Sequence, residues 1–207
     1  MAEERFTIAG PAGELECVMA TPADWQTGAP LAICCHPHPL HGGTLQNKVV
    51  HILAKSLAEL GAKVVRFNFR GAGQSQGQFD HGLGEQQDLL AVAEHLRMTA
   101  DNSPLWLAGF SFGAYVALAA HQQLQPERLA LVALPVDMYP AIKSIQVATQ
   151  DWLLVQGGKD EVVDADAVRQ WAQGQGLPPY WIWLEEAGHF FHGRLTHIQT
   201  QIHQHWA

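Results

Sequence analysis

Short apolar runs alternate with longer amphipathic segments over most of the chain. Six of the runs are predicted strands: residues 29–36, 62–69, 104–110, 128–134, 151–157 and 180–185. A continuous apolar run, such as residues 29–36, is expected for a strand that is buried on both faces. Five segments between and after them have apolar residues at helical spacing: 47–60, 84–100, 114–124, 164–173 and 196–206. Residues 14–20 instead alternate like a half-exposed strand. The pattern predicts an α/β fold with a mostly parallel central sheet and helices on both faces.

The size and composition of the chain are those of a globular protein. Its 207 residues suit one domain, residues 1–207, with 47% hydrophobic and 15% charged residues. The formal net charge is −8 and the twelve Lys and Arg residues are scattered. Because nucleic-acid binding needs clustered cations to replace counterions, we expect no nucleic-acid partner. The sequence does not indicate an oligomeric state.

Neither a secretory signal nor a membrane span is expected from the sequence. The N-terminal residues MAEERFTIAG contain two early glutamates and no apolar stretch. Apolar runs such as residues 129–136 are far shorter than the ~20 residues that a spanning helix needs. Cys17, Cys34 and Cys35 form no CxxC pair, so we expect buried free thiols, with Cys34 and Cys35 on opposite faces of a strand. These features favour a cytoplasmic protein.

Polar and glycine-rich residues follow five of the predicted strands. These segments read HPHPLHGGT, RGAGQSQGQFDHG, GFSFG, GKDEVVD and AGHFFHG. Because parallel strands all end at the same edge of a sheet, the segments should gather there. Ligands bind beyond the carboxyl ends of the strands in such folds, so this edge is the predicted functional site.

The segment GFSFG places Ser111 between a buried strand and a helix of small residues, which we expect to begin at Ala114. The pattern GxSxG in this context is typical of a nucleophile elbow, a sharp strained turn that exposes the serine hydroxyl. Gly109 and Gly113 then avoid a collision across the turn. The N-terminal N–H groups of the following helix favour an oxyanion near Ser111.

A serine hydroxyl needs a neighbouring base, and the base needs a group that orients it. Downstream of Ser111, Asp160 follows one buried strand and His189 follows the next. This order of serine, acid and histidine is the one found in such folds. The alternatives are His192 for the base, and for the acid either Asp137 or Asp164, of which Asp164 better fits a helix N-cap.

We prefer His189 to His192 because Gly188 leaves room for the imidazole. Phe190 and Phe191 can wall that ring from water.

A tetrahedral oxyanion needs two N–H donors. One is expected from the backbone of Phe112, the residue after the serine, and the other from the loop HPHPLHGG. Pro37 and Pro39 lack N–H groups, which leaves His38 and Leu40 as the nearest donors. We favour His38.

Two cofactor hypotheses are weak. His36, His38 and His41 have no acidic residue beside them, and the preceding Cys34 and Cys35 are expected to be buried, so we expect no metal, and His36 instead to pack under the loop. The segment RGAGQSQG lacks the third glycine of a dinucleotide motif, because Gln76 occupies that position. We interpret this segment as a flexible wall of the cleft and expect no cofactor.

Three stretches, HPHPLHGGTLQNKVV, FNFRGAGQSQGQFDHGLGE and WLAGFSFGAYVA, together resemble the α/β-hydrolase fold, and within it a group of small lidless serine hydrolases. The resemblance covers essentially the whole chain. It implies a triad of Ser111, Asp160 and His189, and esterase- or thioesterase-like hydrolysis. The chain is also similar in size to dienelactone hydrolases, which carry a cysteine nucleophile where this chain has Ser111.

A lid domain is not expected, because only about sixteen residues, 135–150, separate two predicted strands where lids usually enter. Water should then reach the cleft and favour hydrolysis over acyl transfer. The leading hypothesis is a serine hydrolase that cleaves small carboxylic esters or thioesters through an acyl-enzyme. The alternatives are a non-catalytic acyl-ligand-binding or scaffold protein, and a small peptidase or acyltransferase on the same fold.

Overall fold

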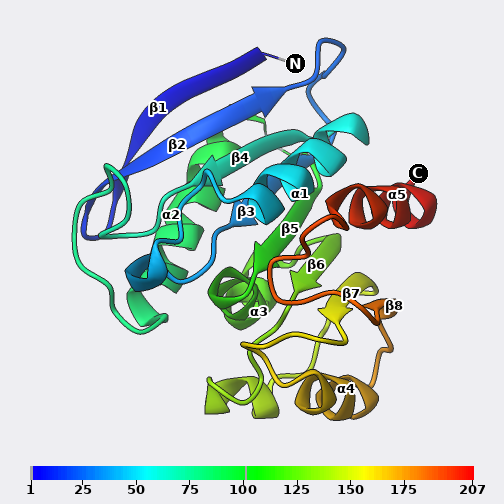
Figure 1. Cartoon of the computed structure of the whole chain (residues 1–207). Coiled ribbons are helices and arrows are strands. Elements are labelled where there is room, and N and C mark those ends of the chain that lie inside the picture. Colours follow the sequence, from blue (N-terminus) through cyan, green and yellow to red (C-terminus); the bar gives the residue numbers. More distant parts are fainter. Residues whose placement is uncertain (1, 101) are drawn as a thin grey trace.

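The computed structural model describes residues 2–100 and 102–207 and is built on one eight-stranded sheet (Figure 1). The strand order is β1-β2-β4-β3-β5-β6-β7-β8. The strands are β1 (Ala2–Gly10), β2 (Gly13–Thr21), β3 (Leu31–Cys35), β4 (Lys63–Phe67), β5 (Leu105–Phe110), β6 (Arg128–Val132), β7 (Asp151–Gly157) and β8 (Tyr180–Leu184). From β4 to β8 all neighbours are parallel, whereas β1 and β2 are antiparallel additions. The predicted mostly parallel sheet is confirmed.

Strand β1 is the element that the sequence pattern did not predict. It forms a hairpin with β2 along its whole length, from Ala2 opposite Thr21 to Gly10 opposite Gly13. The side chains of Glu3, Glu4 and Arg5 are exposed, and charged side chains on an edge strand discourage pairing with another chain. An exposed edge strand lacks the apolar run that marks the inner strands.

The helices lie where the apolar spacing predicted them, with one early start. They are α1 (Lys48–Glu59), α2 (Leu83–Thr99), α3 (Phe112–Leu124), α4 (Ala165–Gln173) and α5 (Leu195–Trp206), with 3-10 turns at η1 (Pro39–His41) and η2 (Pro140–Ser144). Helix α3 begins at Phe112 rather than Ala114, because the carbonyl of Ser111 already accepts the first helical N–H groups. None of these helices, within the described ranges, is long and apolar enough to cross a membrane.

Each face of the sheet carries its own apolar core. Helices α2, α3 and α4 pack on one face, and α1 and α5 pack on the other. Successive residues of β3 alternate between the two cores, so Cys35 lies in the first and Cys34 in the second. The three cysteines are free and buried, as predicted, and burial raises the pKa of the Cys17 and Cys34 thiols to about 12.

The strand order has a switch point between β3 and β5. The chain leaves β3 for β4 on one side, and β5 begins a series that runs to β8 on the other side. Loops that diverge in this way open a crevice at the carboxyl ends of the two strands. The carboxyl ends of β5, β6 and β7 point toward the lower part of Figure 1.

The segment of residues 70–77 is anchored and is not the flexible wall that the sequence indicated. The Glu16 carboxylate of β2 accepts hydrogen bonds from Asn68 Nδ2 (2.6 Å) and from the Gln74 N–H (2.9 Å). The Ser75 hydroxyl accepts from the Glu16 N–H and donates to the Asn68 carbonyl. Glu16 lies more than fifty residues from each of its partners in sequence, so the glycine content of the loop alone does not predict how firmly the loop is held.

A buried ion pair fixes the start of the same loop to α2. Arg70 donates to both carboxylate oxygens of Asp88, at 2.7 Å for the shortest contact, and the Arg70 N–H also donates to Asp88. The Asp88 side chain is fully buried and that of Arg70 is nearly so. Removing one partner of such a pair leaves an uncompensated charge.

We therefore expect Asp88→Ala to lower the free energy of unfolding by about 3–5 kcal/mol, measured by urea denaturation. Asp166→Ala is the matched control, because Asp166 is exposed and pairs with Arg169 in solvent. It should change stability by less than about 1 kcal/mol. Similar small effects for both variants would show that the Arg70–Asp88 pair does not stabilise the fold.

Candidate active site

Ser111 lies on a strained turn between β5 and α3. Its backbone has φ 54° and ψ −119°, a conformation that residues with a side chain rarely adopt. The Ser111 N–H donates to the Val132 carbonyl of β6 (2.8 Å), which holds the turn. A Cβ atom on Gly109 would overlap the carbonyl of Gly113, so the turn requires glycine there.

Three predicted residues from three different loops meet at this turn. The hydroxyl of Ser111 lies 3.1 Å from His189 Nε2, and His189 Nδ1 lies 3.0 and 3.1 Å from the two carboxylate oxygens of Asp160. The side chains of His189 and Asp160 are almost fully buried. The loops after β5, β8 and β7 thus form a continuous hydrogen-bonded chain from hydroxyl to imidazole to carboxylate.

The carboxylate of Asp160 is held in its charged form. Burial acts to raise its pKa, but hydrogen bonds from His189 and from the N–H groups of Val163 and Val162 outweigh burial and keep the pKa below its usual value. The two N–H groups donate to Asp160 Oδ1 at 2.8 and 2.9 Å. A charged Asp160 fixes the proton of His189 on Nδ1 and leaves Nε2 free to accept the proton of Ser111.

The alternative residues lie elsewhere. Asp164 caps α4 by accepting from the N–H groups of Asp166 and Ala167, as its position before the helix predicted. Asp137 is exposed in the loop after β6. His192 is exposed, and its ring lies beside that of Phe190.

The rings that wall His189 differ in part from the expected pair. Phe190 contacts the imidazole edge-on at 5.1 Å, as expected, but the second ring is Phe110, at 5.0 Å. Phe191 turns instead into the core against α1 and α5, with no exposed surface. The expectation for Phe191 is therefore wrong, because the positive φ of 51° at this residue reverses its side chain toward the core.

Two backbone N–H groups near Ser111 are available to an oxyanion. Phe112 is the first residue of α3, so its N–H has no partner within the helix. Among the hydrogen bonds of the described residues, the His38 N–H donates to none, whereas the Leu40 N–H donates to His38 Nδ1 at 3.2 Å. The rings of His38 and Phe112 lie 5.1 Å apart, so the two loops adjoin. This arrangement favours His38 over Leu40.

His36 is buried beneath this loop with both ring nitrogens engaged. Nδ1 lies 2.6 Å from the Pro37 carbonyl, and Nε2 accepts the Phe69 N–H at 3.0 Å. Burial lowers the pKa of His36 to about 4, against a smaller opposing contribution from the Pro37 hydrogen bond. A neutral imidazole with this bonding has no lone pair left for a metal. His36 instead connects the loop after β3 to the segment that follows β4.

The buried His36 should make stability depend on pH. In the unfolded chain this histidine is protonated below about pH 6.5, whereas in the folded protein it is protonated only below about pH 4. The free energy of unfolding therefore falls as the pH drops through this window, by about 3 kcal/mol from this residue. His36→Gln should flatten that fall in urea titrations at pH 4–7, whereas His51→Gln, at an exposed position, should keep the original slope. Equal slopes in all three proteins would refute this role.

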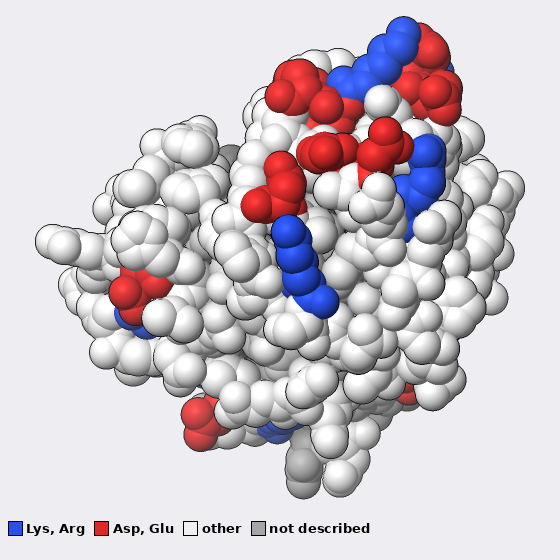
Figure 2. Space-filling view, turned by 90° about the horizontal axis from the view of Figure 1, so that it is seen from below, with Lys and Arg blue, Asp and Glu red and all other residues white. Residues whose placement is uncertain are grey.

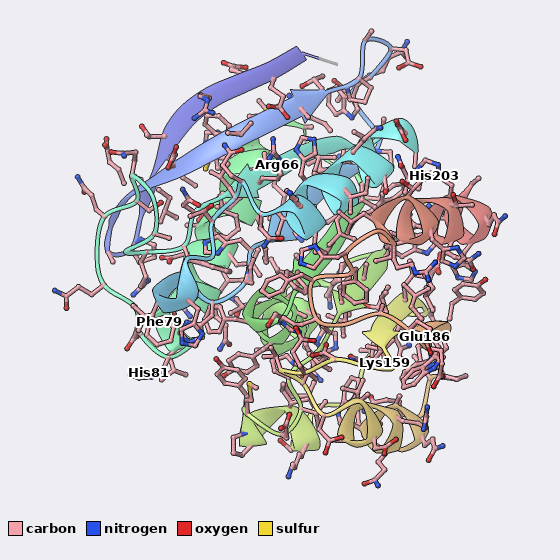
Figure 3. All side chains as sticks on the ribbon, viewed as in Figure 1. Arg66, Phe79, His81, Lys159, Glu186 and His203 are labelled. Atoms are coloured by element: carbon pink, nitrogen blue, oxygen red, sulfur yellow. The ribbon has the colours of Figure 1, made fainter. Side chains whose placement is uncertain are left out.

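Sequence reasoning missed two residues that brace Asp160 and His189. Gln156 of β7 is fully buried and donates from Nε2 to Asp160 Oδ2 (3.1 Å), while its Oε1 has no partner among the described residues. Glu161 accepts the backbone N–H of His189 at 3.1 Å and so joins the loops after β7 and β8. An ion pair between Lys159 and Glu186 links the same two loops (Figure 3). The glutamine that follows the apolar run of β7 was the sequence feature that could have pointed to Gln156.

The sheet order, the serine turn after β5 and the absence of an inserted lid domain define an α/β-hydrolase fold. Residues 38–152 match the model of a family described as serine aminopeptidase, S33, and the chain belongs to this family of α/β-hydrolases.

Similar proteins of known structure share this architecture over almost their whole length. The lidless α/β serine hydrolase XC6422 from Xanthomonas campestris is 41% identical, with a TM-score of 0.92 over 98% of this chain and 92% of that one. An α/β serine hydrolase homologue from Coxiella burnetii is 44% identical, with a TM-score of 0.93 over 100% and 99%. By sequence, the chain is also similar to uncharacterized protein RP471 of Rickettsia prowazekii, which is 36% identical over 169 residues that cover 77% of this chain and 68% of that protein.

Proposed function

We propose that the chain is a single-domain serine hydrolase that cleaves small carboxylic esters or thioesters through an acyl-enzyme. The observation that carries the proposal is the hydrogen-bonded chain from the Ser111 hydroxyl through His189 to the charged Asp160. Membership of a hydrolase family supports it.

In the proposed mechanism His189 Nε2 takes the hydroxyl proton as Ser111 Oγ attacks the acyl carbon. The resulting oxyanion accepts hydrogen bonds from the N–H groups of Phe112 and His38. His189 then returns its proton to the leaving oxygen or sulfur, which departs and leaves an ester on Ser111. Water attacks this ester, with its proton passing to His189, and collapse of the second intermediate restores the Ser111 hydroxyl and releases the acid.

Two features favour this reaction over a non-catalytic binding protein and over acyl transfer. A protein that only bound acyl ligands would gain nothing from a strained Ser111 turn, which costs on the order of 1–3 kcal/mol. The connection from β6 to β7 contains only the short turn η2 and no lid domain, so water reaches the acyl-enzyme and favours hydrolysis over transfer.

Replacing Ser111 or His189 with alanine should lower kcat for p-nitrophenyl acetate by at least about 10⁴-fold, because each removes the nucleophile or its base. The unmodified protein should react with a fluorophosphonate at Ser111, detected by mass spectrometry. Ser103→Ala and His192→Ala are the matched controls, because Ser103 bonds a distant turn and His192 is exposed. Both should keep labelling and activity within about twofold. An intact protein that resists the fluorophosphonate would overturn the mechanism.

The backbone donor at position 38 can be tested by a proline substitution. His38 has φ −53°, which proline adopts without strain, so His38→Pro removes the N–H while preserving the backbone. His38→Ala removes the same ring but keeps the N–H. We expect kcat of His38→Pro to be about 10²–10³-fold below that of His38→Ala. Equal activities in the two variants would assign the second oxyanion donor to another group.

A further inference from the structure

Five rings form a continuous cluster beside Ser111, which we name the aromatic platform: His38, Phe79, Phe112, Tyr115 and Tyr139. Phe112 is its centre, with ring centroids 5.1 Å from His38, 5.6 Å from Phe79, 6.1 Å from Tyr115 and 5.9 Å from Tyr139. Its members come from α3 and from the loops after β3, β4 and β6. Four separate segments thus converge on the residue that follows the proposed nucleophile.

The platform presents ring surface to solvent. Phe112 and Tyr115 are buried and form its floor, whereas His38, Phe79 and Tyr139 are half-buried. Tyr139 stacks on Tyr115 with centroids 4.2 Å apart. Burial, with smaller contributions from Tyr115 and Glu85, raises the pKa of Tyr139 to about 12, so its phenol stays neutral. The exposed surface is therefore uncharged and aromatic.

The loop that carries Phe79 is held in place by a buried carboxylate. Glu85 of α2 has no exposed surface and accepts the N–H groups of Asp80 (2.8 Å) and Gly82 (2.7 Å). Gly82 packs so closely on Tyr115 that a Cβ there would overlap the ring. Phe79 is thus fixed before any ligand arrives, and a preorganised surface loses little entropy on binding.

The proposed chemistry sets which part of a substrate faces the platform. His189 returns a proton to the leaving group, so the leaving group lies on the side of His189. The rings that contact His189 are Phe110 and Phe190, and no ring of the platform contacts it within the described chain. The platform instead surrounds the residues proposed as oxyanion donors. The acyl substituent, directed away from His189, faces the platform.

The surroundings of the platform are apolar. Three exposed large apolar side chains come from the same loops or directly follow them: Leu40 and Leu83, each 68% exposed, and Met138, 48% exposed. Residues 36–47 contain no charged side chain. Phe79 and His81 lie side by side in Figure 3, and much of the face in Figure 2 carries no charge. The platform thus has mainly apolar neighbours, although the same loops also carry the exposed Asp80 and Asp137, and the imidazoles of His41 and His81 contact His38 and Phe79.

From this geometry we infer that the platform binds the acyl part of the substrate and selects acyl groups that carry an aromatic ring on a short linker. The inference rests on the proposed function. Ring pairs in offset or edge-on arrangements strengthen binding by roughly two- to twelvefold beyond the effect of the area that they bury. A saturated ring of the same size buries similar area without this contribution, so the two can be compared directly.

The test compares p-nitrophenyl phenylacetate with p-nitrophenyl cyclohexylacetate, which share a leaving group and an acyl ring of similar size. Each kcat/KM is divided by the rate constant for alkaline hydrolysis of the same ester, because a phenyl ring also makes the carbonyl intrinsically more reactive. We expect kcat/KM of the intact protein to favour phenylacetate about fivefold. Phe79→Leu keeps an apolar side chain but removes the ring, and should bring the ratio close to one. Tyr139→Leu should act in the same direction and carries the test if Phe79→Leu does not fold.

Tyr180→Leu is the matched aromatic-to-leucine control, because Tyr180 begins β8 at the opposite edge of the sheet. This variant should keep the activity of the intact protein and its phenylacetate-to-cyclohexylacetate ratio of kcat/KM. A ratio near one in the intact protein, or one unchanged in the platform variants, would overturn the acyl assignment while leaving the hydrolase proposal intact. Failure to hydrolyse any ester, with no fluorophosphonate labelling of Ser111, would overturn both.

Discussion

The strained turn at Ser111 is the constraint on which the arrangement of the site depends. Its N–H is held by the carbonyl of Val132 in β6, and its carbonyl starts α3. Gly113, one residue into that helix, packs against the carbonyls of Cys35 and His36, so any Cβ would push α3 away from β3. The turn therefore fixes α3 against three strands at once. It also places the start of α3 beside the loop that begins at His36, where the rings of Phe112 and His38 lie 5.1 Å apart.

The loops after β7 and β8 hold two buried polar side chains, those of Asp160 and His189, in line with the Ser111 hydroxyl. Asp160 receives two backbone N–H groups and the Gln156 amide, and Glu161 holds the backbone of His189. Among the described residues Gln156 Oε1 has no partner, whereas its Nε2 donates to Asp160 Oδ2 and to the Gly157 carbonyl. Turning the amide over would place its oxygen against these two acceptors. The orientation of the amide thus keeps its donor on Asp160.

Much of the fold could be predicted from the sequence, because the spacing of apolar residues reflects which faces of a strand or helix are buried. The inner strands carry continuous apolar runs, and the helices carry spaced ones, so their positions and the parallel sheet followed. Ser111, Asp160 and His189 were predicted for a related reason: each lies in a segment that follows a predicted strand. Strand β1 escaped because an exposed edge strand has no apolar run, and its pairing is visible only with β2 beside it.

Contacts between distant segments were also invisible to sequence patterns. The glycine-rich segment of residues 70–77 looked flexible because its anchors, Glu16 on β2 and Asp88 on α2, lie outside it. Phe110, and not Phe191, lies beside His189, because Phe191 has a positive φ that the spacing of residues in the sequence does not reveal. Composition and spacing report which faces are buried, whereas side-chain direction in loops depends on partners that the fold supplies.

In the proposed reaction, the platform and the surroundings of His189 together do without the mobile lid that covers the substrate in other enzymes. A lid closes over a substrate, and its ordering reduces the binding energy gained. Here the apolar surface is already in place, because Glu85 and the Arg70–Asp88 pair hold the loop that carries Phe79. In the proposed mechanism the leaving group departs on the side of His189, whose neighbouring rings are Phe110 and Phe190 and not those of the platform. The proposal therefore assigns the acyl group and the leaving group to two different sets of rings, so that the acyl-enzyme would be held by its acyl group while the leaving group is replaced by water on the His189 side.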